Sequence, residues 1–280
     1  MSTTPANGAT DIDIQHPELW TMHLWLSEQS ISYTLFTRAQ DNSLTWGTIA
    51  LDMSFGDYLK SLENCIYDHP LLLKPYGTVR VVCESSRFAV LPAEVAADDD
   101  LAAEVFAASI PDADGDVALC TMPRCGAAIA FELPRGTKGF LQRTFFNSPI
   151  VHSLMPLCEY YASKQQQTSL QRMFLHLDAE RMRICIFGKG RLLMANVFDY
   201  RNPDDAAFYV LNAWQSFGLD PLADEVQMAG DKPQRDQLTP ILRKYINYVM
   251  PTIFPAAAMR IGHDAVKAPY PLILLSLIHI

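Results

Sequence analysis

The sequence lacks both a long apolar run and an excess of positive charge. Its 280 residues carry a formal net charge of −9 at pH 7. Because nucleic acids and anionic membranes bind through basic surfaces, this balance argues against either as a partner. The longest apolar stretch, YPLILLSLIHI at 270–280, is too short to span a bilayer. The N-terminal residues have neither the basic nor the apolar part of a secretory signal, so we expect a cytoplasmic protein.

Framework spacings of metal-binding or disulfide-bonded proteins are also missing. The six cysteines are scattered, and several lie in apolar strand-like runs, where a free thiol acts as a small core residue. Cys120 and Cys125 resemble half of a zinc site, but no second pair with ligand spacing follows. The acidic loop 112–116 (DADGD) lacks the register and the final glutamate of an EF-hand. We therefore expect a reduced protein without a bound metal ion.

What the chain does contain is a clear order of strand and helix patterns. In the first half, the spacing of apolar residues predicts strands at 21–27, 30–37, 44–52 and 78–84, and helices over 54–69 and 97–109. Ser54 is the expected N-cap of the first of these helices. Further strands at 117–122 and 127–133 and a helix over 152–165 complete this half.

The second half repeats this order about 150 residues later. Strands are predicted at 172–178, 181–187, 191–200, 224–230 and 253–259, and helices over 203–217 and 234–249. Asn202 is the expected N-cap of the helix that follows the third strand, and Pro203 occupies its first position. The repeat indicates an internal duplication, with a flexible leader at 1–18, a first subdomain at 19–165 and a second at 166–280. The polar stretch SKQQQTS (163–169) is the predicted linker.

Three antiparallel strands that lead into a helix, followed by alternating strands and helices, resemble a ribonuclease-H-like domain. Two such halves in tandem resemble the actin-like ATPase superfamily that includes the PilM and FtsA types. More narrowly, the chain is similar to a bacterial family of unknown function that has this fold. The resemblance covers nearly the whole chain. It implies an α/β protein of two ribonuclease-H-like subdomains, each a five-stranded mixed sheet flanked by helices, with a cleft between them.

The resemblance also implies where a nucleotide would bind. In that superfamily the first hairpin turn of each half is a phosphate loop of the type Asp-x-Gly. Here the second-half turn, Asp178-Ala179-Glu180, keeps the aspartate but not the glycine, and the first-half turn, Ser27-Glu28-Gln29, keeps neither. The adenosine site of the superfamily has a glycine pair, of which Gly230 is present while Asp231 replaces its neighbour. The matching first-half position is near Ser85-Ser86.

All three nucleotide motifs are therefore degraded. Glutamates in both hairpin turns would repel a triphosphate. Gly188-Lys189-Gly190 lacks the spacing of a phosphate-binding loop, so we interpret it as a turn. We interpret Asp178 and Gly230 as degenerate nucleotide-site positions and expect neither a catalytic residue nor a cofactor. If Asp178 serves only the turn, Asp178→Asn should cost well under ~1 kcal/mol of stability.

One stretch is locally basic. Residues 133–146 (LPRGTKGFLQRTFF) place Arg135, Lys138 and Arg143 among phenylalanines. The pattern is typical of an amphipathic helix with a solvated basic face, and a partner-docking or anion-binding element is the alternative.

Three functions stay open at this point. The leading hypothesis is a non-catalytic actin-like scaffold, a pseudo-ATPase that binds another cytoplasmic protein. The second is an ATP-binding ATPase or kinase-like enzyme that uses Asp178 alone. The third is a metabolite or peptide sensor that uses the cleft between the subdomains. Fold alone selects none of them, because function depends on the site.

Overall fold

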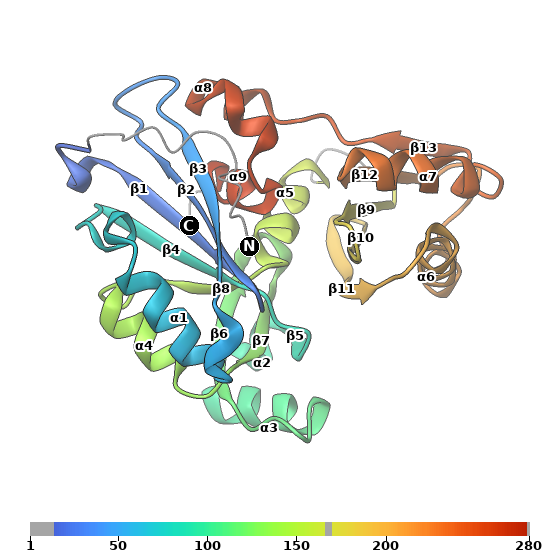
Figure 1. Ribbon diagram of the computed structural model, residues 1–280. Helices are drawn as coiled ribbons and strands as arrows, with labels where there is room; N and C mark the ends of the chain where they lie inside the picture. Colours follow the sequence, from blue (N-terminus) through green and yellow to red (C-terminus); the bar gives the residue numbers. More distant parts are fainter. Residues whose placement is uncertain (1–13, 166–169, 279–280) are drawn as a thin grey trace. The chain divides into compact units, whose positions relative to one another are not determined.

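The computed structural model describes residues 14–165 and 170–278 (Figure 1). The chain divides into two compact units. The first contains Met1–Thr121, Ala128–Pro156 and Pro255–Ile280, and the second contains Met122–Ala127 and Leu157–Phe254. Parts of the predicted leader (1–13) and of the predicted linker (166–169) lie outside the described residues. The predicted subdomain boundary near residue 165 stays a prediction, although the segment from Pro255 onward packs with the first unit.

The first unit is built on a five-stranded sheet with the order β3-β2-β1-β4-β8. The central strand β1 pairs antiparallel with β2 and parallel with β4, and β4 pairs parallel with β8. The strands are β1 (Thr21–Leu26), β2 (Ser30–Phe36), β3 (Thr45–Ala50), β4 (Thr78–Cys83) and β8 (Ile150–His152).

A second, three-stranded sheet in this unit has the order β5-β7-β6. Its strands are β5 (Phe88–Pro92), β6 (Asp116–Met122) and β7 (Ala127–Leu133). Sequence analysis does not predict β5. The helices of this unit are α1 (Tyr58–Tyr67), α2 (Ala93–Ala96), α3 (Asp99–Ser109), α4 (Thr137–Thr144), α8 (Ala256–Ile261) and α9 (Tyr270–Leu277). Its 3-10 turns are η1 (Pro17–Leu19), η2 (Met53–Phe55), η3 (Pro70–Leu73) and η5 (His263–Lys267), whereas η4 (Pro123–Cys125) belongs to the second unit.

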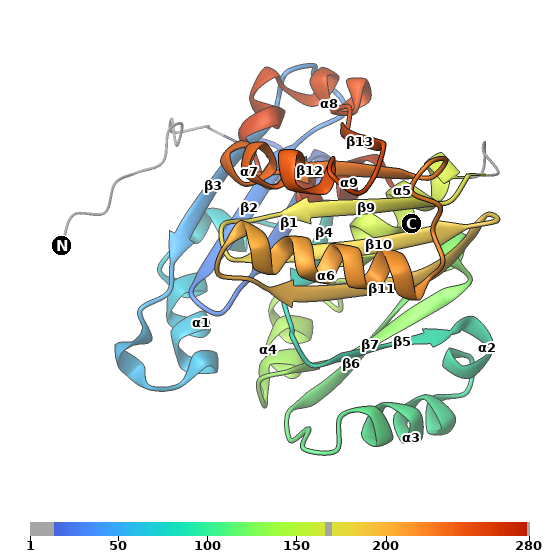
Figure 2. The ribbon, with the colours of Figure 1, turned by 90° about the vertical axis from the view of Figure 1, so that its right-hand side faces the viewer.

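The second unit has a five-stranded sheet with the corresponding order, β11-β10-β9-β12-β13. The central strand β9 pairs antiparallel with β10 and parallel with β12. Its elements are α5 (Met155–Gln165), β9 (Arg172–Leu177), β10 (Arg181–Gly188), β11 (Arg191–Asp199), α6 (Pro203–Ser216), β12 (Glu225–Gly230), α7 (Lys232–Leu242) and β13 (Tyr248–Pro251). Figure 2 shows α6 lying across the sheet, where its residues Val210 and Trp214 join the buried core. Each unit thus contains a five-stranded mixed sheet, as predicted.

Helix caps explain two of the boundaries. Asn202 accepts hydrogen bonds from the backbone N–H groups of Asp204 and Asp205, which confirms the predicted start of α6. The predicted cap Ser54 is wrong, because Asp57 accepts from the N–H groups at the start of α1 and Ser54 lies within η2.

Two predictions near the C-terminus are also wrong. The helix over 234–249 ends at Leu242, and its last residues form β13. The strand predicted over 253–259 is instead the helix α8, because three consecutive alanines favour helix after Pro255. Across the described residues, each helix is too short or too polar to cross a membrane.

Candidate functional site

The first hairpin turn of the second unit carries Asp178. The backbone N–H of Asp178 donates to the carbonyl of Arg181 (2.8 Å), which closes the turn between β9 and β10. Neither Ala179 nor Glu180 has a positive φ, so this backbone needs no glycine there. The hydroxyl of Tyr200 donates to the carbonyl oxygen of Asp178 and fixes the turn against the end of β11.

The carboxylate of Asp178 is occupied by two partners from its own sheet. Oδ2 accepts a hydrogen bond from Nη1 of Arg183, and Oδ1 lies 3.6 Å from Nδ1 of His176. The Arg183 side chain is 1% exposed, whereas that of Asp178 is 41% exposed. Burial by itself would raise the pKa of Asp178, but His176 and Arg183 hold it below its usual value. The expectation that Asp178 only shapes the turn is wrong, because it is the counter-ion of a buried arginine.

Gly230 lies beside this turn at the end of β12. It pairs with Leu177, and a Cβ on Gly230 would lie 2.1 Å from the Leu177 carbonyl oxygen. With a φ of 93°, the position favours glycine for backbone reasons alone. Asp231 donates its N–H to the same carbonyl (2.7 Å), and burial, together with nearby Asp178, raises the pKa of Asp231. Arg235 Nε donates to the Gly230 carbonyl (3.0 Å). The structure therefore brings Asp178 and Gly230 to one end of the sheet.

The corresponding turn of the first unit has the same backbone and different side chains. The N–H of Ser27 donates to the carbonyl of Ser30 (3.0 Å), and the hydroxyl of Tyr58 donates to the carbonyl of Ser27 (3.2 Å). Each unit thus has a tyrosine hydroxyl bonded to the first carbonyl of this turn. Gln29 stands at the glycine position of the Asp-x-Gly pattern, and Glu28 adds a carboxyl group to the turn.

The end of β4 shows which residues correspond to Gly230 and Asp231. Cys83 pairs with Leu26, the last residue of β1, and the N–H of Glu84 donates to the Leu26 carbonyl (2.9 Å). The first-unit counterpart is therefore Cys83-Glu84, and the predicted pair Ser85-Ser86 follows directly after it.

A cavity of about 300 Å³ opens at this edge of the first unit. Ligands of α/β sheets bind at the carboxyl ends of the strands, and this volume is at the lower end of typical small-molecule sites. The cavity is lined by the ends of β1 and β4, by η2, by the start of α1 and by the residues before α4. These residues are Leu26, Ser27, Glu28, Met53, Tyr58, Cys83, Glu84, Leu133, Pro134 and Thr137.

The lining is acidic and apolar. Burial raises the pKa of the Cys83 thiol and of the Tyr58 phenol, so both groups are protonated at neutral pH. Glu28 and Glu84 supply carboxyl groups, and the lining residues of this cavity include no lysine or arginine. Because phosphate binding needs cations or a cluster of free N–H groups, this cavity suits a neutral or cationic group better than a phosphate.

The metal-like and basic patterns have structural roles. Glu132 Oε1 accepts from the N–H groups of Asp114 (2.7 Å) and Gly115 (2.6 Å), which holds the acidic loop against β7. Arg135 and Lys138 donate to carbonyl oxygens of the same region, at 2.8 Å each. Over residues 14–165 and 170–278, no three His, Cys, Asp or Glu side chains are grouped as metal ligands.

Sequence analysis misses the partners of Asp178. The signal was present, because Arg183 lies in the middle of the strand RMRICIF, where its neighbours on both sides are buried. A charged residue in a buried strand requires a counter-ion, and Asp178 is five residues away across the hairpin.

The chain belongs to the family described as "Protein of unknown function (DUF3822)", whose profile matches residues 9–249. No curated protein matches the sequence.

The solved structures similar to the chain include the following two. One is a Bacteroides thetaiotaomicron protein with an actin-like ATPase fold and unknown function, at 21% identity and a TM-score of 0.80, covering 96% of this chain and 99% of that one. The other is a PilM–PilN type IV pilus biogenesis complex, at 12% identity and a TM-score of 0.56, covering 92% and 99%. The chain therefore has the actin-like ATPase fold, which confirms the predicted fold class.

Proposed function

We propose that this protein is a non-catalytic actin-like scaffold that binds another protein in the cytoplasm. The proposal is carried by the ion pair between Asp178 and Arg183. Asp178 is the one residue that still matches the phosphate-loop pattern, and its carboxylate already neutralises a buried guanidinium.

A phosphate-loop aspartate has to be available to a metal-bound water. Releasing Asp178 would take its carboxylate away from the buried charge of Arg183, which would destabilise the second unit. Glu180 places a charged side chain at the glycine position of the Asp-x-Gly pattern, and Glu28 adds negative charge to the first-unit turn. These three features each oppose nucleotide binding. We therefore assign the protein a role in binding another protein rather than in catalysis.

A protein partner is supported by the PilM–PilN structure, in which a protein of similar fold forms a complex. The negative charge of this chain disfavours an anionic partner such as nucleic acid. A protein that engages the scaffold should bind without nucleotide, since the proposal gives ATP no role.

An ATP-dependent enzyme is the second candidate. One observation favours this enzyme: the Asp178 side chain is 41% exposed to solvent. A Mg²⁺ ion could reach such a carboxylate if Arg183 moved aside.

Isothermal titration with Mg-ATP and Mg-ADP separates the two candidates. We expect no measurable binding by the wild type, by Asp178→Asn or by Ala179→Gly. Micromolar binding by the wild type that disappears in Asp178→Asn would overturn the non-catalytic assignment. Affinity capture from native cytoplasm, followed by reconstitution with the purified partner, tests the scaffold role. A stoichiometric complex that forms equally with and without Mg-ATP supports it, and a complex that requires ATP contradicts it.

A further inference from the structure

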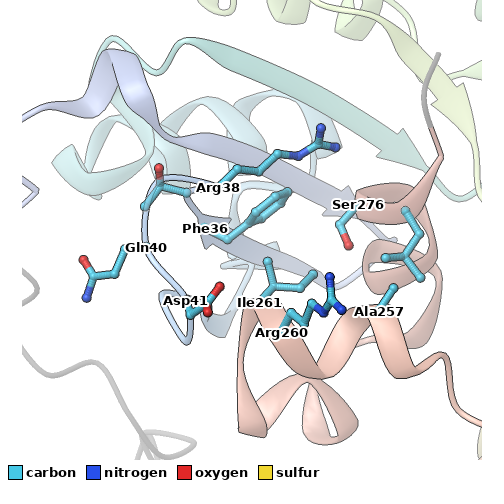
Figure 3. Close-up of a pocket in the computed structure, with 10 residues that line it drawn as sticks. Phe36, Arg38, Gln40, Asp41, Ala257, Arg260, Ile261 and Ser276 are labelled. Carbon is cyan, nitrogen blue, oxygen red and sulfur yellow. The ribbon is translucent and has the colours of Figure 1, made fainter.

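A second cavity of the first unit, far along the sheet from the turn of Ser27, has the opposite electrostatic character. It encloses about 420 Å³ between the end of β2, the connection to β3, and the helices α8 and α9 (Figure 3). Its lining residues are Phe36, Thr37, Arg38, Gln40, Asp41, Ala257, Arg260, Ile261, Ser276 and Leu277. Segments more than 200 residues apart in the sequence thus form one pocket.

Two arginines from different elements reach this pocket. Figure 3 shows the guanidinium groups of Arg38 and Arg260 on the same side as Ser276, with the Phe36 ring near them, while Gln40 points away. Within the described residues neither guanidinium forms an ion pair with a carboxylate, although Asp41 also lines the pocket. Both arginines are exposed residues, so an anion from the solvent can reach their guanidinium groups.

The positive charge extends behind the pocket. Burial lowers the pKa of Arg80, which lies on β4, and the nearby charge of Arg38 lowers it further. Holding these like charges near each other costs free energy, which an oxyanion between or beside them would offset. Arginine is suited to this task because its planar fork binds carboxylate and phosphate oxygens in pairs.

The rest of the lining combines apolar and polar side chains. Phe36, Ile261 and Leu277 offer contact area for hydrocarbon, and the Ser276 hydroxyl already donates to the Ile273 carbonyl (2.6 Å). Asp41 would repel a ligand with several negative charges, so the lining disfavours a triphosphate. The volume fits a small molecule of metabolite size.

We propose that this pocket binds a small organic anion, with one carboxylate or phosphate group held by Arg38 and Arg260 and a hydrocarbon portion against Phe36 and Ile261. This site goes beyond the proposed scaffold function and does not depend on the fate of the Asp178 turn. Since the ligand would contact both the β2–β3 connection and α8, its binding would also stabilise the first unit against unfolding.

The test uses the full chain and defined probes. Hexanoate, hexyl phosphate, inorganic phosphate and hexylamine are titrated against the wild type by thermal shift and calorimetry. We expect hexanoate or hexyl phosphate to bind and to raise Tm, inorganic phosphate to bind more weakly, and hexylamine not to bind. Which of the two chain-bearing anions binds more tightly distinguishes a carboxylate ligand from a phosphate ligand.

Variants assign the binding to this pocket. Arg38→Gln and Arg260→Gln should each weaken the better anion about tenfold or more, because each removes a charge-assisted contact. Arg191→Gln at the start of β11, an exposed arginine outside the pocket, is the matched control and should change nothing. Equal affinity in the Arg38→Gln/Arg260→Gln double variant, binding of hexylamine comparable to hexanoate, or no binding of any anion would each overturn the proposal. A folded circular dichroism spectrum with unchanged Tm in the unliganded variants keeps the result interpretable.

Discussion

The two five-stranded sheets end their central strands in the same backbone arrangement and in different chemistry. In the second unit, the end of β9 is filled by an internal ion pair between Asp178 and Arg183. In the first unit, the end of β1 opens onto a cavity of about 300 Å³ with Glu28 and Glu84 in its lining. In both, a tyrosine hydroxyl holds the first carbonyl of the turn.

This difference shows that one backbone arrangement can carry two different sets of side chains. The tyrosine contacts preserve the hairpin geometry, so the side chains of the turn are free to change without loss of the sheet. In one turn the Asp178 carboxylate is the counter-ion of Arg183, and in the other the corresponding residue is Ser27. Variants made in both sheets test this comparison.

The largest expected effect is a loss of stability in acid, because each sheet buries a histidine on its central strand. Burial lowers the pKa of His23 to about 3, and the charges of Arg80 and Arg38 lower it as well. The contact with the Leu272 carbonyl acts in the opposite direction and raises this pKa. Burial lowers the pKa of His176 to about 4, with Asp178 opposing the shift.

The two lowered histidine pKa values determine how stability changes with pH. The unfolded chain, with histidine pKa values near 6.5, binds more protons than the folded chain in this window, so stability is complete above pH 6.5 and falls toward pH 4. We expect a loss of roughly 3 kcal/mol for each histidine across that window. Urea unfolding at pH 7, 5.5 and 4.5 measures it, and His23→Gln and His176→Gln should each flatten the profile. Unchanged profiles in both variants would contradict the prediction.

The substitution Gly230→Ala should cause the next largest loss of stability. The new Cβ would meet the Leu177 carbonyl at 2.1 Å, and the φ of 93° disfavours alanine, so we expect a loss of about 3 kcal/mol. Cys83→Ala, the counterpart in the first unit, should cost about 1 to 2 kcal/mol because it removes only a buried sulfur. Equilibrium denaturation of both variants gives the comparison. Equal costs would show that the close approach at Gly230 has no energetic consequence.

Asp178→Asn should cost about 2 kcal/mol. The value lies below the 3–5 kcal/mol typical of fully buried pairs, because the carboxylate is 41% exposed and partly screened. The double variant Asp178→Asn/Arg183→Met should recover most of this loss, since it also removes the buried positive charge that Asp178 balances. Chemical denaturation and a double-mutant cycle measure the coupling. A loss well under ~1 kcal/mol in the single variant would restore the view that Asp178 only shapes its turn.

The substitution Ser27→Ala should cause the smallest loss of stability. The Ser27 hydroxyl bonds within its own turn, to the Ser30 carbonyl at 3.1 Å and the Ser30 hydroxyl at 2.9 Å, and it has no buried charge to balance. We expect a loss of about 1 kcal/mol by the same denaturation assay. A cost as large as that of Asp178→Asn would show that the two turns do not differ energetically.

Local patterns in the sequence predicted most of the strands and the start of α6. Asn202 and Pro203 act on the backbone next to them, so their effect can be predicted without the rest of the fold. The strand β5 was missed because its sheet forms through pairing with the distant β7. The predicted strand at 253–259 failed because Ala256, Ala257 and Ala258 follow helix propensity.

The candidate site was predicted less completely. Sequence analysis located the hairpin turns and the glycine at the end of β12, since those follow from strand order. The Asp178–Arg183 pair was missed: the buried arginine signalled that a counter-ion was needed, but which carboxylate it meets depends on strand register. The pocket of Arg38 and Arg260 joins residues more than 200 positions apart, which no local pattern connects.

The return of the chain to the first unit after Phe254 has a consequence for synthesis. Leu44 donates its N–H to the Ile261 carbonyl (2.8 Å), Asn42 donates to the Arg260 carbonyl (3.1 Å), and His23 contacts the Leu272 carbonyl (3.4 Å). On the ribosome, the second unit is complete once Phe254 has emerged, while the first unit still waits for α8 and α9. The N-terminal strands are therefore made first and finish folding last, and for that interval their unpaired edges and apolar faces are substrates for chaperones.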